Sequence, residues 1–132
     1  MATPPLIKVL VVEEDAATRW AVHDVLKAAG YLVAEAPAGK PILHQLQESQ
    51  HEWVVVLDGK TPERDGLAFL QRIAREPALV KRHAYILLTD RRQTFPMPLV
   101  RVFRQLGVRV LQKPVEPEAL TVAVKQVASR LA

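Results

Sequence analysis

The chain has 132 residues, of which 49% are hydrophobic and 24% are charged, with 18 Lys and Arg against 14 Asp and Glu. This composition is typical of a globular protein and excludes the disordered and fibrous classes. The absence of cysteine excludes disulfides, thiolate metal sites and thiol nucleophiles, and favours a cytoplasmic location. We expect a single domain over residues 1–132.

Nothing in the sequence predicts contact with a membrane. Residues 1–5 lack the charged start and apolar stretch of a signal peptide, and no apolar run approaches the ~18 residues that a membrane span requires. The formal charge of +4 would permit contact with nucleic acid, but the basic residues are scattered among acidic ones and have no interleaved aromatic residues. Direct binding of nucleic acid is therefore not expected.

Apolar runs and helical segments alternate along the chain. Strands are predicted at residues 6–12, 31–36, 53–57, 85–88 and 108–112, and helices at 16–29, 41–50, 66–76, 98–106 and 117–131. Gly30 ends the first helix, the third stops before Pro77, and proline opens the second, fourth and fifth. Five strands that alternate with five helices predict a parallel sheet with helices on both faces, because each right-handed crossover places its helix on one side.

Polar side chains follow the predicted strands at the edge of the sheet where such folds bind ligands. Glu13 and Glu14 follow the first strand, Asp58 the third, Thr89 the fourth and Lys113 the fifth. If the first and third strands are neighbours, ~4.8 Å apart, the three carboxylates repel one another unless a cation lies among them. Oxygen ligands without cysteine or clustered histidine favour Mg²⁺ as that cation.

Four segments carry a resemblance to a known family. They are VLVVEED at residues 9–15, VVVLDGKTPERDG at 54–66, YILLTD at 85–90 and VLQKP at 110–114. In order and spacing they resemble the receiver domains of two-component response regulators, and the resemblance covers nearly the whole chain. It implies an α/β, flavodoxin-like (βα)5 fold, with a doubly wound five-stranded parallel sheet in the strand order 2-1-3-4-5.

The resemblance implies a phosphoacceptor and a set of metal ligands. Asp58 would be the phosphoacceptor, with its carboxylate as the nucleophile. Glu14 and Asp58 would bind Mg²⁺ directly and Glu13 through a water molecule. The backbone carbonyl of Lys60 would complete the protein ligands.

The resemblance also implies how the site acts and which partners it has. Thr89 and Lys113 would cover the charge that develops during phosphoryl transfer, and the Lys113–Pro114 bond can be cis. Phosphorylation would then rearrange the fourth strand, fourth helix and fifth strand. The implied partners are a histidine kinase or histidine phosphotransfer protein, an output domain or effector protein, and a second copy across the face from the fourth helix to the fifth strand. Such a domain is not an enzyme beyond catalysing its own phosphotransfer and dephosphorylation.

Two acidic residues depart from the family pattern. Glu14 stands where aspartate is usual, and its extra methylene enters a site where Mg²⁺ demands near-octahedral geometry. Asp90 follows Thr89 where a small residue is usual, and it either pairs with Lys60 across the entrance to the site or extends into solvent as Lys60 does. Asp15 is expected to cap the first helix and to stay outside the site.

The output side of the chain departs from the family as well. The segment between Thr89 and Gly107 is about three residues longer than expected, and Pro96 and Pro98 stiffen it. Val110 occupies the position of an aromatic residue whose rotamer follows phosphorylation in the family, so that readout is absent. A second hypothesis is therefore a degenerate receiver that acts as a phosphorylation-independent interaction module. A third, a flavodoxin-like enzyme or cofactor binder, is disfavoured because EEDAAT at residues 13–18 would repel phosphate.

Several side chains remain to be placed. The resemblance implies that Trp20 faces outward near the acidic residues, where it either contributes to kinase docking or is partly covered by its neighbours. The histidines show no metal-binding spacing, and we expect all of them on the surface: His23, His44, His51 and His83. The i, i+3, i+4, i+7 spacing in the fourth helix predicts four core residues: Leu99, Val102, Phe103 and Leu106.

Overall fold

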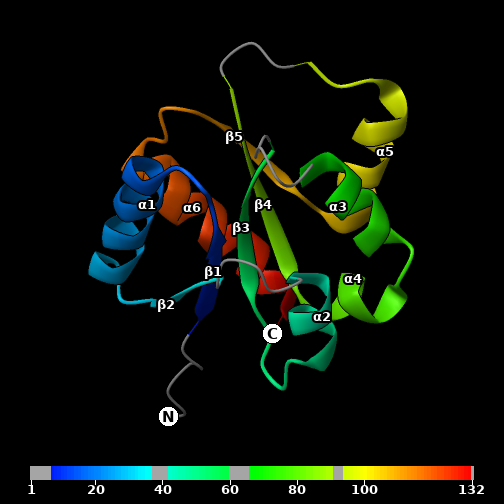
Figure 1. Cartoon of the computed structure of the whole chain (residues 1–132), viewed down its shortest axis with the longest axis horizontal. Helices are drawn as coiled ribbons and strands as arrows, with labels where there is room; N and C mark the ends of the chain where they lie inside the picture. Colours follow the sequence, from blue (N-terminus) through cyan, green and yellow to red (C-terminus); the bar gives the residue numbers. More distant parts are fainter. Residues whose placement is uncertain (1–6, 37–41, 60–65, 91–93, 132) are drawn as a thin grey trace.

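Five parallel strands form one sheet in the order β2-β1-β3-β4-β5 (Figure 1). The structure is a computed structural model, which describes residues 7–36, 42–59, 66–90 and 94–131. The strands are β1 (Lys8–Val12), β2 (Leu32–Glu35), β3 (Val54–Asp58), β4 (Ala84–Thr89) and β5 (Arg109–Gln112). The predicted sheet and its strand order are confirmed.

Burial differs between the centre and the edges of the sheet. Every residue of β3 and β4 is buried, whereas β2 and β5 at the edges each carry exposed residues at both ends. This difference agrees with the sequence, in which β3 and β4 are apolar up to their last residues, Asp58 and Thr89, and the edge strands carry charged or polar residues at their ends.

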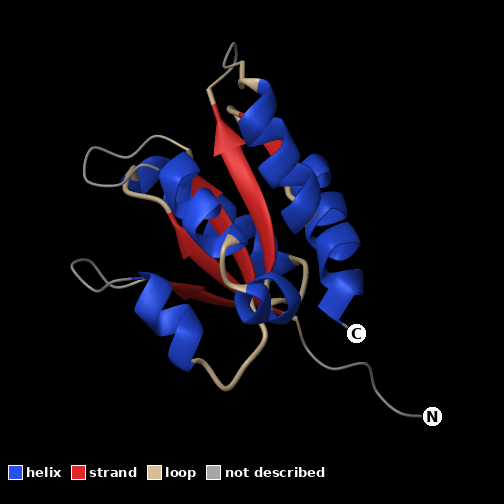
Figure 2. Cartoon of the chain, turned by 90° about the vertical axis from the view of Figure 1, so that its right-hand side faces the viewer, coloured by secondary structure: helices blue, strands red, loops and turns tan. Residues whose placement is uncertain are grey.

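Helices cover both faces of the sheet. α1 (Ala16–Ala28) and α6 (Pro117–Ala128), with a short 3₁₀ helix (Ser129–Leu131) after it, pack on one face. The other face carries α2 (Ile42–Glu48), α3 (Gly66–Ala74), α4 (Pro77–Arg82) and α5 (Met97–Leu106), and Figure 2 shows the molecule from this side. The residues of each central strand alternate between the two cores, because successive side chains point to opposite faces of a sheet. For example, Val9 and Val11 face α1 and α6, whereas Leu10 and Val12 face the opposite core.

One prediction about the helices is wrong. The third helix ends at Ala74 instead of Glu76, and a separate helix, α4, begins at Pro77, so that the described residues contain six α-helices instead of five. Proline suits the first position of a helix because its ring fixes φ and its missing N–H needs no partner there. Leu79 anchors α4 in the core, and the Tyr85 hydroxyl donates a 2.9 Å hydrogen bond to the Leu79 carbonyl.

The ends of two helices depend on glycines in the left-handed region. Gly30, two residues after α1, has φ +95°, and Gly107, which follows α5, has φ +66°. The Arg130 guanidinium donates a hydrogen bond to the Leu106 carbonyl and lies where a Cβ at position 107 would be. Of the predicted core residues of α5, Phe103 and Leu106 are buried, and Leu99 and Val102 are partly buried against the same cluster. Among the described residues, no helix combines the length and the apolar character that a membrane span requires.

Candidate functional site

The carboxyl ends of the central strands bring the predicted polar residues to one edge of the sheet. Val12 of β1 pairs with Leu57 of β3, so that Glu13 and Asp58 lie next to each other. β4 pairs with β3 on one side, and on the other side its last residue, Thr89, pairs with Gln112, which precedes Lys113. Residues from four strands therefore meet, as the sequence predicts.

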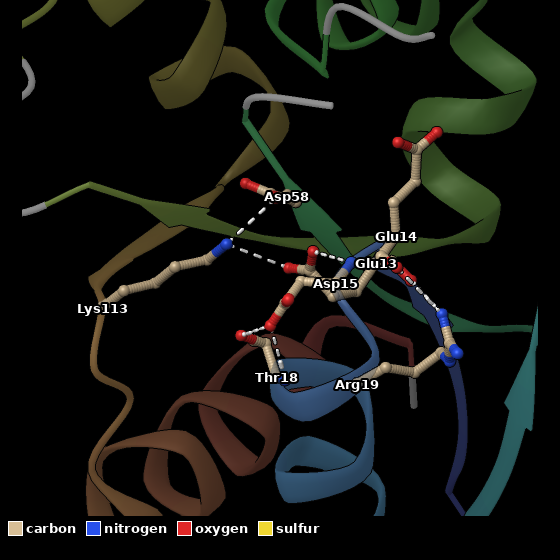
Figure 3. Close-up of polar contacts among 7 residues, drawn as sticks. All are labelled: Glu13, Glu14, Asp15, Thr18, Arg19, Asp58 and Lys113. Carbon is tan, nitrogen blue, oxygen red and sulfur yellow. Dashed lines mark hydrogen bonds and ion pairs between the residues drawn. The ribbon is translucent and has the colours of Figure 1, made fainter. Parts of the chain in front are cut away.

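The Lys113 ammonium lies between two buried carboxylates (Figure 3). Its Nζ donates a 3.0 Å hydrogen bond to Asp58 Oδ2 and is 3.1 Å from Glu13 Oε2. Glu13 and Asp58 are each 6% exposed, whereas the Lys113 side chain is 23% exposed. The predicted repulsion between carboxylates is thus offset in part by a cation of the protein itself.

Burial and charge act in opposite directions on these groups. Burial and the neighbouring Asp58 carboxylate raise the pKa of the Glu13 carboxyl. The Asp15 N–H and the Lys113 ammonium lower it, but the raising effects are larger. Burial alone would lower the pKa of Lys113, but its hydrogen bond to Asp58 and its ion pair with Glu13 outweigh this effect and raise the pKa above its usual value. Lys113 is therefore a permanent positive charge at neutral pH.

Thr89 is buried at the end of β4. Backbone hydrogen bonds join this end of β4 to the residues that directly follow β3 and β5. The Thr89 carbonyl accepts a 2.8 Å hydrogen bond from the Lys113 N–H, and the Gly59 N–H donates a 2.9 Å bond to the Leu88 carbonyl. The Lys113–Pro114 peptide bond is cis.

The two glutamates after β1 point in different directions. Figure 3 shows the Glu13 carboxylate beside Lys113, whereas the Glu14 carboxylate extends away from Asp58, and Glu14 is exposed. Glu13 Oε1 accepts a 3.0 Å hydrogen bond from the Asp15 N–H. The Asp15 side chain accepts bonds of 2.9 Å from the Thr18 N–H and 2.7 Å from the Thr18 hydroxyl, which confirms its predicted role as the cap of α1.

Sequence reasoning missed Arg19, which reaches back from α1 to the same loop. Its Nη1 donates to the carbonyls of Glu13 and Glu14, at 3.0 and 3.2 Å. Its Nε is 3.5 Å from Glu35 Oε2 on β2. An arginine one turn into the helix that follows an acidic pair is a signal that could have identified this contact.

The donors around Asp58 fit a hard divalent cation. In the described part of the chain, no three His, Asp or Glu side chains gather as a metal site, and Glu13 and Asp58 are the two carboxylates that meet. Glu13 Oε2 is buried and accepts no well-aligned hydrogen bond, so its contact with Lys113 is an ion pair that leaves a lone pair available. Mg²⁺ is commonly held by one or two carboxylates and water. Lys60, whose carbonyl is the remaining predicted ligand, lies outside the described residues.

Other predicted features lie around the site. Asp90 is exposed after β4, and the predicted Lys60–Asp90 pair falls outside the described residues because of Lys60. Trp20 is 61% exposed on α1, with its ring centroid 6.2 Å from that of His23, which confirms its outward orientation. Val110 is 38% exposed on β5.

A hollow of about 310 Å³ lies beside Lys113, between α1 and α6. Small and apolar side chains form most of its wall: Ala17, Ala21, Val25, Pro114, Pro117 and Leu120. The hollow extends the site from the edge of the sheet onto the α1 side of the molecule.

The prediction that all four histidines lie on the surface is wrong for His83. Its side chain is 0% exposed, its Nδ1 accepts a 3.0 Å hydrogen bond from the Trp53 N–H, and its Nε2 donates to the Leu46 carbonyl at 3.1 Å. Burial lowers the pKa of this imidazole, so it is neutral. The spacing of histidines bears on metal binding alone and does not reveal that a neutral imidazole joins two backbone groups inside a core. The other histidines are exposed or partly exposed.

Comparison with known proteins places the chain in a family. The sequence model of the family named response regulator receiver domain matches residues 9–125. The chemotaxis protein CheY of Rhizobium etli is 31% identical over 129 residues, which cover 96% of this chain and 96% of that protein. The aerobic respiration control protein ArcA of Escherichia coli K12 is 31% identical over 135 residues, covering 98% of this chain and 50% of that protein.

A solved structure shows the same arrangement. The chemotaxis response regulator CheY4 of Vibrio cholerae superposes with a TM-score of 0.71 at 27% identity, over 93% of this chain and 99% of that one. Receiver domains generally depend on Mg²⁺, and Glu13 and Asp58 are suited to that ion. The family model, the curated relatives and the fold agree: this chain belongs to the receiver domains of two-component response regulators.

Proposed function

We propose that this receiver domain accepts a phosphoryl group on Asp58 in a reaction that depends on Mg²⁺. The observation that supports the proposal most strongly is the Lys113 ammonium, held 3.0 Å from a buried Asp58 carboxylate at the ligand-binding edge of the sheet. The buried Asp58 carboxylate supplies the nucleophile, and the Lys113 ammonium beside it supplies a counter-charge for the incoming phosphoryl group.

The reaction forms a bond between an Asp58 carboxylate oxygen and phosphorus and breaks the bond from phosphorus to the donor atom. With a phosphohistidine donor, the imidazole leaves and takes its proton from solvent. Lys113 and the Thr89 hydroxyl cover the charge on the phosphoryl oxygens. Mg²⁺, held by Glu13 and Asp58 and, as the family resemblance implies, by Glu14 and the Lys60 carbonyl, supplies further neutralisation when bound.

The proposed reaction requires a phosphodonor, and the phosphorylated domain requires a partner that reads its state. The donor is a histidine kinase or a histidine phosphotransfer protein in the cytoplasm. The hollow beside Lys113 offers an apolar surface for it, and Trp20 is exposed on α1, the helix that forms one wall of the hollow. The phosphorylated form acts on an output domain or an effector protein. A second copy of the chain would bind across α5 and β5, where Val110 is exposed.

A degenerate receiver that binds partners without phosphorylation is the second candidate. The outward position of the Glu14 carboxylate favours it, because the described site then holds fewer metal ligands than the family pattern implies. The exposed Asp90 favours it as well, because a carboxylate at the entrance repels a phosphodonor.

Acetyl phosphate separates the two candidates. With Mg²⁺ present, we expect the intact mass to rise by about 80 Da, the mass of one phosphoryl group. The adduct should be absent without Mg²⁺ and absent in Asp58→Asn. If the wild-type protein gains no mass with Mg²⁺, or if Asp58→Asn gains as much, phosphorylation of Asp58 is refuted.

A further inference from the structure

Arg19 connects α1 to the backbone that carries both glutamates of the site. One guanidinium nitrogen donates to the carbonyls of Glu13 and Glu14, at 3.0 and 3.2 Å, and the side chain is 30% exposed. Because these carbonyls belong to neighbouring residues, their two hydrogen bonds fix the direction of the chain as it leaves β1. Figure 3 shows the guanidinium on the side of the loop opposite to Lys113.

This fixed backbone determines where each glutamate points. Glu13 Oε1 accepts a 3.0 Å bond from the Asp15 N–H, which holds the carboxylate in the crevice beside Asp58, whereas the Glu14 carboxylate extends outward. This hydrogen bond between the Glu13 side chain and the N–H two residues later ties the carboxylate to the turn between β1 and α1. Arg19 supports that turn from outside, and the Asp15 cap supports it through α1.

A residue on β2 in turn holds Arg19. Glu35 Oε2 is 3.5 Å from Arg19 Nε, and Glu35 Oε1 is 3.2 Å from His23 Nδ1, so both partners of Glu35 come from α1. Arginine suits this position because its planar fork can bond in several directions at once. A connected path therefore runs from β2 through Arg19 to the loop that carries Glu13.

We propose that Arg19 is a positioning residue, which sets the Glu13 carboxylate beside Asp58 for cation binding, with Glu35 as its support. The link to phosphorylation rests on the function proposed above, whereas the effect of Arg19 on the loop does not. Without Arg19 the Glu13–Glu14 carbonyls lose their shared donor, the turn opens, and the Glu13 carboxylate leaves the crevice for part of the time.

The test compares Arg19→Ala with Lys27→Ala, which removes the same charge from the exposed last turn of α1. The first readout is the hydrogen exchange of the Asp15 amide, measured by NMR, because that N–H donates to Glu13. We expect exchange to become about tenfold faster in Arg19→Ala and to stay unchanged in Lys27→Ala. The second readout is the Mg²⁺ dissociation constant from calorimetry, which we expect to rise about tenfold in Arg19→Ala alone.

Glu35→Gln tests the ion pair between Glu35 and Arg19. Glu35 is 39% exposed, so this variant should fold, and we expect a smaller acceleration of Asp15 exchange in the same direction. Unchanged exchange in Glu35→Gln would refute the supporting role of Glu35. Unchanged Asp15 exchange in Arg19→Ala, or equal effects in Lys27→Ala, would refute the positioning role of Arg19. A wild-type protein that is not phosphorylated, but whose Asp15 exchange responds to Arg19→Ala, would refute the proposed function and leave the role of Arg19 intact.

Discussion

The two ends of the central strands bury polar groups of opposite kinds. At the carboxyl end, the carboxyl groups of Glu13 and Asp58 share one ammonium, Lys113. At the amino end, His83 precedes β4, is neutral and bonds to two backbone groups. Both sites lie against the same sheet, yet one is open to a ligand and the other is closed.

This contrast distinguishes the proposed functional site from a structural one. Glu13 Oε2 accepts no well-aligned hydrogen bond and Lys113 is partly exposed, so the carboxyl end has capacity for a further charged group. Both ring nitrogens of His83 are engaged, so the amino end can accept nothing more. Buried polar groups that are fully bonded stabilise one arrangement, whereas incompletely paired charges are expected where ligands bind.

Lys113→Ala should produce the largest change at the carboxyl end. It removes the cation that covers the phosphoryl oxygens and leaves two carboxylates facing each other. We expect the rate of phosphorylation by acetyl phosphate to fall about 100-fold or more. Lys125→Ala removes an equal charge from the exposed surface of α6 and should phosphorylate at the wild-type rate. If Lys113→Ala is phosphorylated at a rate within threefold of wild type, the activation free energy has changed by at most roughly 0.6 kcal/mol. That result would show that Lys113 is not part of the reaction.

His83→Ala tests the amino end. The change leaves the Trp53 N–H and the Leu46 carbonyl without their partner and opens a cavity in the core. We expect the free energy of unfolding in urea to fall by about 2–3 kcal/mol, because buried unpaired groups and cavities both destabilise. His51→Ala, on the exposed surface, should change it by less than about 0.5 kcal/mol. Equal stability of the two variants would contradict a structural role for His83.

The sequence predicts the carboxyl end of the sheet better than the amino end. Asp58 and Thr89 each follow an apolar run directly, Lys113 follows the last residue of β5, and parallel strands place such residues at one edge. His83 also adjoins a strand, but its burial depends on backbone groups of Leu46 and Trp53 that are distant in sequence. Nothing in the local pattern indicates which backbone groups a histidine will meet.

At Pro77 and Glu14 the structure also differs from what the sequence predicts. The sequence interpretation read Pro77 as the end of a helix, whereas it starts α4, and both are places where proline is common. The outward direction of the Glu14 side chain depends on the backbone conformation that Arg19 holds. That conformation cannot be read from the presence of a glutamate at position 14. The order of the strands and the edge where their polar ends meet were predictable, whereas the hydrogen bonds of Arg19 and His83 to the backbone of other segments were not.

The two glutamates offer a test of the site geometry. We expect Glu13→Gln to raise the Mg²⁺ dissociation constant about tenfold, because it removes charge from the buried carboxylate beside Asp58. Glu14→Gln should raise it less, because the Glu14 side chain is exposed. Calorimetric titration of both variants measures the difference. A larger effect from Glu14 would show that its carboxylate turns inward when Mg²⁺ binds.

The pH dependence of stability should show the smallest effect. Burial lowers the pKa of His83, so below about pH 6.5 the unfolded chain binds a proton that the folded chain does not. The free energy of unfolding therefore falls as the pH decreases, by at most about 1.4 kcal/mol per pH unit from this group. His83→Asn should flatten the urea-derived profile between pH 7 and 5. Parallel profiles for the two proteins would contradict the neutral, buried imidazole.

Locating the phosphoryl group tests the central claim most directly. The protein is incubated with acetyl phosphate and Mg²⁺, digested, and each peptide is sequenced by tandem mass spectrometry. We expect the added mass on Asp58 alone, and none in the Asp58→Asn protein. Modification of another residue, or an unmodified Asp58 under conditions that phosphorylate other receiver domains, would contradict Asp58 as the phosphoacceptor.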